Sequence, residues 1–394
     1  MSTADRWLLP DGVEEMLPPE ATCLEGLRRE LLDRYNSWGY DLVLPPLVEY
    51  LESLLVGAGD DLALQTFKLT DQATGRLMGI RADMTPQVAR IDAHTLHREG
   101  PTRLCYVGDV LHTKPASLAS SRSLIQIGAE LYGHIGISSD IEIIELMLET
   151  LSVSGCDNVH LDLGHVAIYR ALAEQAALSG EQEMALFNIY QRKAVPELQA
   201  FLIENVSNPA LKGAFESLAG LAGDQTILET ARQQLQHVCP ALTAIIDDLH
   251  QVAATISARH PKVTLYFDLG ELRGYHYHTG VVFSAYLPGM GQSIACGGRY
   301  DHIGEAFGRA RPATGFSTDL ACLVKIKQQK DSVVAPMVFA PAVDDSSLQA
   351  EIKLLRQQGQ RVVVSLPGQQ VIPAEMGCTQ QFVKKGDRWV VASL

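Results

Sequence analysis

The sequence lacks three features that mark whole classes of protein. Its seven cysteines are scattered and never form a CxxC pair, which disfavours a disulfide framework or a zinc site and favours reduced thiols in a cytoplasm. No apolar run is long enough to span a bilayer, and the apolar start at Trp7 stops at Pro10, so neither a membrane segment nor a secretion signal is expected. Basic residues are in the minority. The 32 Lys and Arg against 46 Asp and Glu leave a formal net charge of −14, which disfavours a general nucleic-acid surface because such surfaces need clustered cations.

The composition itself is that of a globular protein, with 46% hydrophobic and 20% charged residues. A chain of 394 residues exceeds one ordinary core, so two or three domains are expected. Apolar residues recur at helical spacing from Thr22 to Trp38, and Gly39 follows where a helix C-terminal cap belongs. An extended segment, Tyr40–Leu44, comes next and is closed by Pro45 and Pro46.

Five further segments have the composition of short strands, and few helices alternate with them. This pattern predicts an antiparallel sheet flanked by helices rather than a doubly wound parallel sheet. The segments are Leu104–Leu111, Leu124–Tyr132, Val263–Leu269, Thr279–Tyr286 and Ile294–Cys296. A helical insertion is predicted at about residues 165–260, where Ala, Leu and Gln recur at helical spacing. From about residue 333, β-rich runs flank one helix at Ser346–Gln358. The predicted architecture is therefore α+β, with a core domain at residues 1–325 and a small C-terminal α/β domain at residues 333–394.

One of these strands carries polar side chains on a single face. Along Leu124–Tyr132, side chains alternate between faces, so Gln126, Gly128 and Glu130 share one face and the apolar residues share the other. A glycine between two polar residues leaves room for a ligand to approach the backbone. A strand with one face in water explains the same pattern without a ligand.

Two segments carry a family resemblance. Arg103–Gly133 (RLCYVGDVLHTKPASLASSRSLIQIGAELYG) and Ser293–Leu323 (SIACGGRYDHIGEAFGRARPATGFSTDLACL) resemble motifs 2 and 3 of class II aminoacyl-tRNA synthetases, specifically histidyl-tRNA synthetase. The resemblance implies a class II synthetase-like fold, in which each motif contributes an arginine that clamps ATP. An ungapped match places His112 at the first arginine, Lys114 at an acidic residue two places on, and Cys322 at the second arginine. The ATP chemistry of the family is therefore expected to be lost.

The same resemblance implies an amino-acid pocket. Arg81–Pro86 resembles the loop that holds the ammonium group of histidine, with Asp83 where the family has glutamate and with Thr85 two places on. Gln126 and Glu130 match the residues that touch the amino group and the imidazole. Charged hydrogen bonds of this kind are worth about 1.5–3 kcal/mol each. A helix N-cap is a second role open to Asp83 or Thr85, because a proline follows at the first helical turn.

A third segment, Leu272–Phe283, resembles the histidine-specific signature of histidyl-tRNA synthetases. Arg273 matches the arginine that pairs with the ligand carboxylate, and a guanidinium fork suits that contact. Tyr277 and His278 match two tyrosines beside the imidazole, so His278 departs from the pattern. A metal site at His276 and His278 is a competing interpretation, but no further ligand lies at a recognisable spacing. No metal and no cofactor are therefore expected.

Two acidic pairs, Asp247–Asp248 and Asp344–Asp345, resemble the pair that binds pyrophosphorylated ribose in phosphoribosyltransferases. Neither pair is followed by a glycine-bearing phosphate loop. Each is predicted to be a solvated acidic pair near a helix.

A chain with a histidine pocket and a degenerate ATP clamp resembles the regulatory subunits of ATP phosphoribosyltransferase. That resemblance implies a non-catalytic subunit that joins a short-form catalytic subunit in a hetero-octamer. It further implies support and histidine feedback of the first step of histidine biosynthesis, without tRNA as a partner. A homodimer through Thr22–Tyr50 and Gly297–Gly315 is expected, as in class II cores. A functional histidyl-tRNA synthetase and a stand-alone histidine sensor or ligase are the alternatives.

Overall fold

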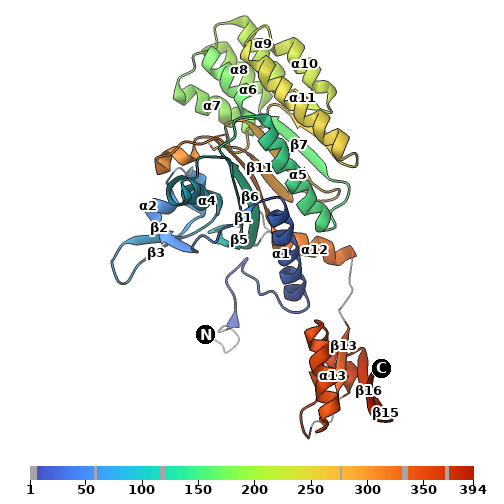
Figure 1. Cartoon of the computed structure of the whole chain (residues 1–394). Coiled ribbons are helices and arrows are strands. Elements are labelled where there is room, and N and C mark those ends of the chain that lie inside the picture. Colours follow the sequence, from blue (N-terminus) through green and yellow to red (C-terminus); the bar gives the residue numbers. More distant parts are fainter. Residues whose placement is uncertain (1–6, 57–59, 116–120, 276, 331–335, 369–371) are drawn as a thin grey trace. The chain divides into compact units, whose positions relative to one another are not determined.

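The structure, a computed structural model, describes residues 7–56, 60–115, 121–275, 277–330, 336–368 and 372–394 (Figure 1). The chain divides into two compact units, Met1–Lys330 and Asp331–Leu394, called here the core unit and the C-terminal unit.

Nine strands among the described residues form the main sheet of the core unit. Their order is β1 (Asp41–Leu42), β5 (Thr102–Leu111), β6 (Ser123–Tyr132), β12 (Ala313–Asp319), β11 (Ala295–Arg299), β10 (Val281–Tyr286), β7 (His160–His165), β9 (Thr264–Asp268) and β8 (Ala222–Gly223). Neighbouring strands are antiparallel except for the β1–β5 and β7–β9 pairs. The predicted antiparallel sheet is thus confirmed, but β7, β8 and β12 were not predicted. The sequence of β12, ATGFSTD, has the small and polar residues of a turn, and it is a strand because it is paired on both sides.

Helices α1 (Glu20–Ser37), α5 (Ile137–Val153) and α12 (Leu320–Lys330) cover one face of this sheet (Figure 1). Leu31 and Tyr35 of α1 are fully buried there, and the Tyr35 hydroxyl lies 3.0 Å from Thr150 Oγ1 of α5. The predicted apolar face of β6 packs into the same core, with Ile127 and Ala129 fully buried. The predicted helix end is also confirmed, because Gly39 follows the C-cap with φ of +82°.

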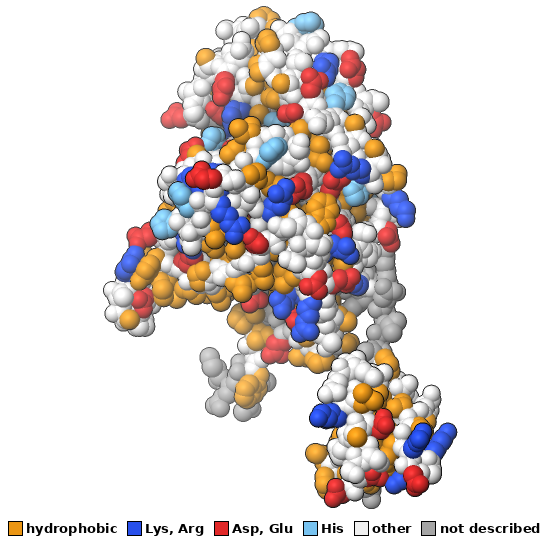
Figure 2. All heavy atoms as spheres, viewed as in Figure 1, with side chains coloured by type: hydrophobic (Ala, Val, Ile, Leu, Met, Phe, Trp, Pro, Cys, Tyr) orange, Lys and Arg blue, Asp and Glu red, His pale blue; other side chains and the backbone are white. Residues whose placement is uncertain are grey.

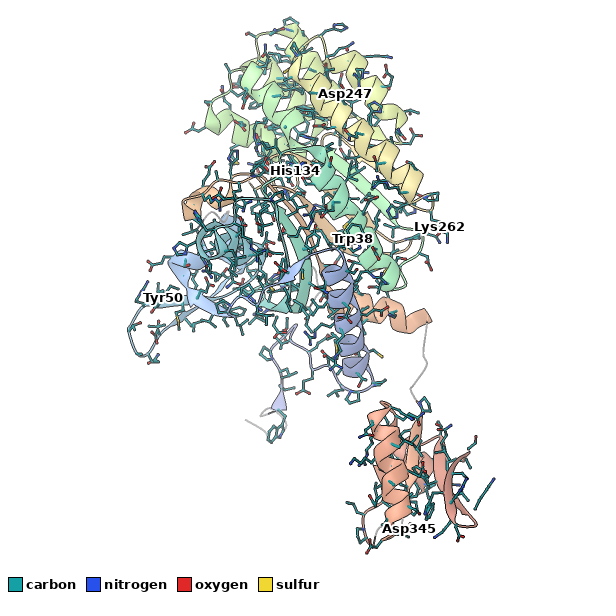
Figure 3. All side chains as sticks on the ribbon, in the orientation of Figure 1. Trp38, Tyr50, His134, Asp247, Lys262 and Asp345 are labelled. Carbon is teal, nitrogen blue, oxygen red and sulfur yellow. The ribbon has the colours of Figure 1, made fainter. Side chains whose placement is uncertain are left out.

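A group of helices follows β7 and precedes β9 in the sequence, and it forms the upper part of the core unit in Figure 1. They are α6 (Val166–Gln175), α7 (Gly180–Gln191), α8 (Val195–Asn205), α9 (Pro209–Leu218), α10 (Thr226–Leu235) and α11 (Ala241–Arg259). They occupy the stretch for which a helical insertion was predicted. Asp247 of the first acidic pair lies on α11 (Figure 3), where it forms an ion pair with Arg232 and is exposed. Of the helices in the described ranges, none combines the length and apolar character that crossing a membrane requires.

A small sheet with strand order β2 (Val48–Tyr50), β4 (Leu77–Ile80) and β3 (Phe67–Thr70) lies beside the main sheet, together with the short helices α2 (Leu51–Leu54) and α3 (Asp60–Gln65). The predicted helix at Pro86–Leu96 divides into α4 (Thr85–Arg90) and a π-helix, η2 (Ile91–Leu96). Its N-cap residue is Met84, without a side-chain cap. The prediction that Asp83 or Thr85 is the N-cap residue is therefore wrong, because Met84 holds that position; Asp83 lies one residue earlier and accepts from the amide of Thr85, the first residue of α4, at 3.0 Å.

The C-terminal unit is a four-stranded sheet with one long helix. The strand order is β14 (Arg361–Val364), β13 (Met337–Ala340), β15 (Gln380–Lys385) and β16 (Arg388–Ser393). Helix α13 (Ser346–Gln357) buries Leu348 and Ile352 against Val338 and Phe382. Asp345 of the second acidic pair (Figure 3) caps this helix, since its Oδ1 accepts hydrogen bonds from two backbone amides at the helix start, 2.9 and 3.3 Å away.

Candidate amino-acid-binding site

A pocket of about 230 Å³ lies on the polar face of the main sheet, opposite the α1–α5–α12 core. Strand register builds its floor, because Glu130 of β6 faces Gly315 of β12, which in turn faces Gly298 of β11. A Cβ atom at Gly315 would lie 1.5 Å from Glu130 Oε2. The absence of a side chain at this position therefore makes room for the carboxyl group.

Glu130 lines one end of the pocket, and its side chain is only 1% exposed. The Tyr106 hydroxyl donates to its Oε1 at 2.8 Å, and the Tyr300 hydroxyl donates to its Oε2. Burial raises the pKa of the Glu130 carboxyl to about 8, although both hydrogen bonds act in the opposite direction. Near pH 7 the group is therefore mainly protonated and can donate one hydrogen bond to a ligand.

The phenol of Tyr277 is the unsatisfied polar group of this pocket. Its ring stacks on Tyr300 with centroids 4.9 Å apart, and its hydroxyl is buried without a hydrogen-bond partner among the described residues. A buried hydroxyl without a partner is costly. A polar ligand atom in the pocket would remove that cost.

Asp83 and Thr85 stand at the other polar end of the pocket. Asp83 Oδ1 accepts from the Thr85 amide at 3.0 Å, from Thr85 Oγ1 at 3.1 Å and from Gln126 Nε2 at 2.8 Å. Gln126 Oε1 accepts from the Met84 amide at 2.8 Å, so both ends of the Gln126 amide are used within the protein. Gln126 is not among the residues that line the pocket and instead fixes the orientation of Asp83.

Arg273 and His278 complete the predicted set of ligand residues. Nη1 of Arg273 lies 3.2 Å from the Tyr286 hydroxyl, and the side chain is 56% exposed, so its guanidinium is accessible to a carboxylate. His278 Nδ1 lies 3.3 Å from the Arg299 carbonyl. Burial lowers the pKa of His278 to about 4, so its imidazole is neutral at pH 7.

The predicted ATP-clamp positions offer no guanidinium. His112 Nε2 lies 2.9 Å from the Ala82 carbonyl oxygen, so this ring nitrogen already has a hydrogen-bond partner within the protein. Lys114 is exposed, and Cys322 packs against the hydrophobic core, where burial raises the pKa of its thiol. An imidazole, an exposed amine and a thiol cannot replace two arginine forks.

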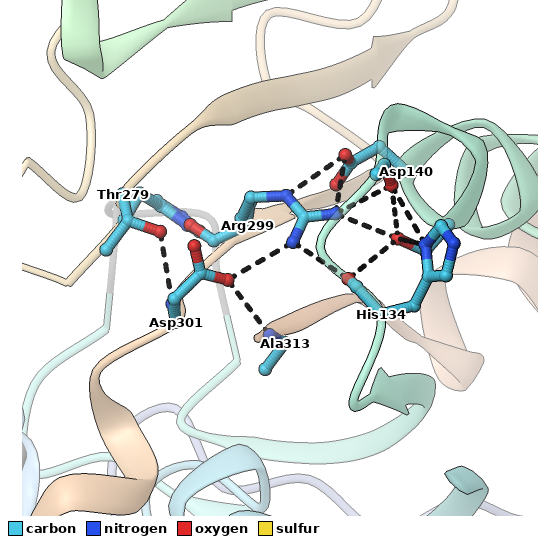
Figure 4. Close-up of polar contacts among 9 residues, drawn as sticks. His134, Asp140, Thr279, Arg299, Asp301 and Ala313 are labelled. Carbon is cyan, nitrogen blue, oxygen red and sulfur yellow. Dashed lines mark hydrogen bonds and ion pairs between the residues drawn. The ribbon is translucent and has the colours of Figure 1, made fainter. Parts of the chain in front are cut away.

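A buried ion-pair network is centred on Arg299 (Figure 4). Arg299 of β11 donates to Asp140 Oδ2 from Nη2 at 2.8 Å and from Nε at 3.1 Å, and its Nη1 lies 3.2 Å from Asp301 Oδ1. Asp301 Oδ1 also accepts from the Ala313 amide at 3.0 Å, and the Asp301 amide donates to Thr279 Oγ1 at 3.0 Å. The network ties α5, β11 and β12 to the segment that carries Tyr277 and His278.

Sequence reasoning missed several lining residues. Tyr300 lines the pocket from the segment that resembles motif 3, within which it was given no role. The neighbouring Arg299 does not line the pocket, and an arginine in an otherwise small and apolar strand was the signal for its buried ion pair. Asp162, Ser284 and Cys296 line the pocket from adjacent positions of β7, β10 and β11. Their faces could be assigned only once the strand register was known.

The competing metal site at His276 and His278 rests on a residue outside the described part of the chain. Within the described ranges, no group of three or more His, Cys, Asp or Glu residues is arranged to hold a metal ion.

This fold has counterparts among known proteins. A family model for histidyl-tRNA synthetase matches residues 12–323, and a model for the ATP phosphoribosyltransferase subunit HisZ C-terminal domain matches residues 335–392. The crystal structure of an ATP phosphoribosyltransferase regulatory subunit/histidyl-tRNA synthetase from Bacillus halodurans is similar with a TM-score of 0.81 and 26% identity, over 94% of this chain and 96% of that one. A histidyl-tRNA synthetase from a Nostoc species shares the fold with a TM-score of 0.77 and 18% identity, over 98% of this chain and 97% of that one.

The fold is therefore that of the histidyl-tRNA synthetase-like class II proteins. Over its full length the chain is 54% identical to the ATP phosphoribosyltransferase regulatory subunit of Pseudomonas savastanoi pv. phaseolicola, with 100% of both chains covered. The chain belongs to the ATP phosphoribosyltransferase regulatory subunit family.

Proposed function

We propose that this chain is a non-catalytic regulatory subunit of ATP phosphoribosyltransferase that acts in histidine biosynthesis in the cytoplasm. The observation that carries the proposal is the contrast between two parts of one site. The pocket holds an ordered carboxylate, a buried carboxyl group and an accessible guanidinium, whereas His112, Lys114 and Cys322 stand at the ATP-clamp positions. Loss of one preorganised charge contact typically costs about 2.7–4 kcal/mol in the transition state, so loss of several abolishes adenylate formation.

The ligand of the pocket is free histidine. Asp83 and Thr85 suit its ammonium group, Arg273 its carboxylate, and Glu130 with Tyr277 its imidazole. Gln126 does not contact the ligand but orients Asp83 through a hydrogen bond. His278 lines the pocket beside Tyr277 as a neutral ring, with the two ring centroids 5.3 Å apart. Histidine influences catalysis only to the extent that it binds two states of the assembly with different affinity.

The core unit also has an apolar surface that suits a second copy of the chain. Hydrophobic side chains gather over the part of the core unit that carries β2 and β3 (Figure 2). Exposed leucines of the core unit include Leu42 of β1 at 47%, Leu44 just after β1 at 71% and Leu64 of α3 at 75%. Covering such side chains is favourable, and we assign them to a homodimer within a hetero-octamer with a short-form catalytic subunit. A monomeric mass by light scattering of the isolated chain contradicts the dimer.

Mixing the chain with a short-form catalytic subunit tests the function. We expect a stable complex by size-exclusion chromatography, higher phosphoribosyl transfer than the catalytic subunit shows alone, and inhibition by histidine. We expect no histidine-dependent pyrophosphate exchange by this chain alone and no binding of tRNA. Exchange at the rate of an ordinary synthetase identifies a functional histidyl-tRNA synthetase instead, and absence of any complex identifies a stand-alone sensor.

A further inference from the structure

The segment between β9 and β10 is held on two sides. The described residues 272–275 and 277–279, called here the ligand loop, include Arg273 and Tyr277, which line the pocket. Tyr275 of the same loop is buried in the opposite direction, at 5% exposure, among residues of the helical insertion. Its ring stacks on Phe187 of α7 with centroids 5.5 Å apart and meets Tyr169 of α6 edge-to-face at 5.1 Å.

One arginine of the helical insertion hydrogen-bonds to the backbone of this loop at two positions. Nη2 of Arg170 on α6 donates to the carbonyl oxygens of Tyr275 and of His278, each at 3.2 Å. The Arg170 guanidinium also lies 4.9 Å from the centroid of the Tyr275 ring. The two carbonyls flank Tyr277 in the chain, so a single side chain fixes the backbone on both sides of that pocket residue.

Helix α7 adds contacts of its own. The Tyr275 hydroxyl donates to Glu183, and Gln191 Nε2 donates to the Leu272 carbonyl at 3.3 Å. Lys193, just beyond α7, donates to Asp268 at the end of β9 at 3.0 Å. The insertion therefore holds the ligand loop at its start and along its length.

We propose that Arg170 is a positioning residue for the pocket, and that it couples occupancy of the pocket to the packing of α6 and α7 in the helical insertion. The proposal rests on the proposed function, in which histidine is the ligand of this pocket. Arg273 and Tyr277 meet the ligand only while the loop keeps this backbone conformation. If the ligand loop loses this conformation in part of the molecules, the apparent affinity for histidine falls in proportion to the fraction that keeps it. By reciprocity, a ligand that stabilises the loop must also stabilise its contacts with α6 and α7.

The test compares three variants of the full chain. Arg170→Ala removes both hydrogen bonds to the loop backbone, and Arg170→Lys keeps a cationic donor at this position. The control, Arg192→Ala, removes an exposed ion pair with Glu197 elsewhere in the insertion. Calorimetry is expected to show histidine affinity at least about tenfold weaker in Arg170→Ala, which corresponds to 1.4 kcal/mol. Arg170→Lys should recover part of the loss, and Arg192→Ala should bind as the unaltered chain does.

Hydrogen exchange with mass spectrometry gives the second readout. In the unaltered chain, histidine should slow exchange in peptides of residues 180–191 as well as in the ligand loop. In ligand-free Arg170→Ala, the ligand loop should exchange faster while peptides of α1 and α5 do not change. Faster exchange throughout the core unit would mean a folding defect, and the comparison of the unaltered chain with and without histidine then decides.

The proposal is overturned if Arg170→Ala binds histidine as tightly as the unaltered chain, or if histidine leaves the exchange of residues 180–191 unchanged. Failure of the unaltered chain to bind histidine removes the proposed function instead. In that case, hydrogen exchange in ligand-free Arg170→Ala still tests whether Arg170 fixes the backbone of the ligand loop. An unchanged exchange rate in the loop overturns that role.

Discussion

Replacing Glu130 by glutamine should remove a specific part of the pH dependence of stability. The carboxyl group is 1% exposed, and burial raises its pKa to about 8 from an ordinary value of 4.5. The folded protein therefore retains this proton over a range in which the unfolded chain has lost it. Glutamine keeps the shape of the side chain but cannot titrate.

The sign and size follow from proton linkage. Below pH 4.5 both states hold the proton, and above pH 8 both have lost it, so the group adds no slope at either end. Between these values the folded state binds one more proton than the unfolded state, so the free energy of unfolding falls as pH rises, by about 1.4 kcal/mol per pH unit. The total across the window is about 3–5 kcal/mol at most. Loss of one phenol hydrogen bond to the glutamine amide adds a pH-independent cost of about 1–3 kcal/mol.

Urea unfolding followed by circular dichroism measures this effect. The free energy of unfolding of Glu130→Gln, minus that of the unaltered chain, should rise steadily from pH 4.5 to about pH 8. Other titrating groups are common to both proteins and cancel in the difference. A difference that stays constant across this range would refute the reasoning, because it would mean that Glu130 is ionised in the folded state.

Three further predictions concern the floor and the frame of the site. Gly315→Ala places a Cβ atom 1.5 Å from Glu130 Oε2, so the carboxyl group must move, and calorimetry should show at least about tenfold weaker histidine binding; unchanged affinity would contradict this. Asp140→Ala leaves the Arg299 guanidinium buried and without its closest carboxylate, so urea unfolding should show a loss of about 3–5 kcal/mol. A loss below about 1 kcal/mol, typical of a surface pair, would exclude this role. Ser179→Ala removes the capping box of α7 and should cost about 1 kcal/mol in the same assay, whereas Ser179→Asn should keep most of that stability; equal losses in both would argue against capping.

The sequence by itself determined the features that depend on local pattern. Alternation along β6 separated the buried Ile127 and Ala129 from the face that carries Glu130, because successive side chains of a strand point to opposite faces. Helical spacing and a following Gly39 placed α1 to within two residues of its observed ends, Glu20 and Ser37. The motif resemblances indicated the fold class and the family for the same reason, since they rest on short runs of consecutive residues.

Only the tertiary structure decided how distant segments meet. Tyr300 reaches Glu130 from 170 residues away, and Arg299 reaches Asp140 from 159 residues away. The turn-like sequence of β12 became a central strand because β6 and β11 pair with it on both sides, and that pairing brings Gly315 beside Glu130. Pairings of this kind depend on strand register and buried side chains far along the chain, and no local pattern specifies them.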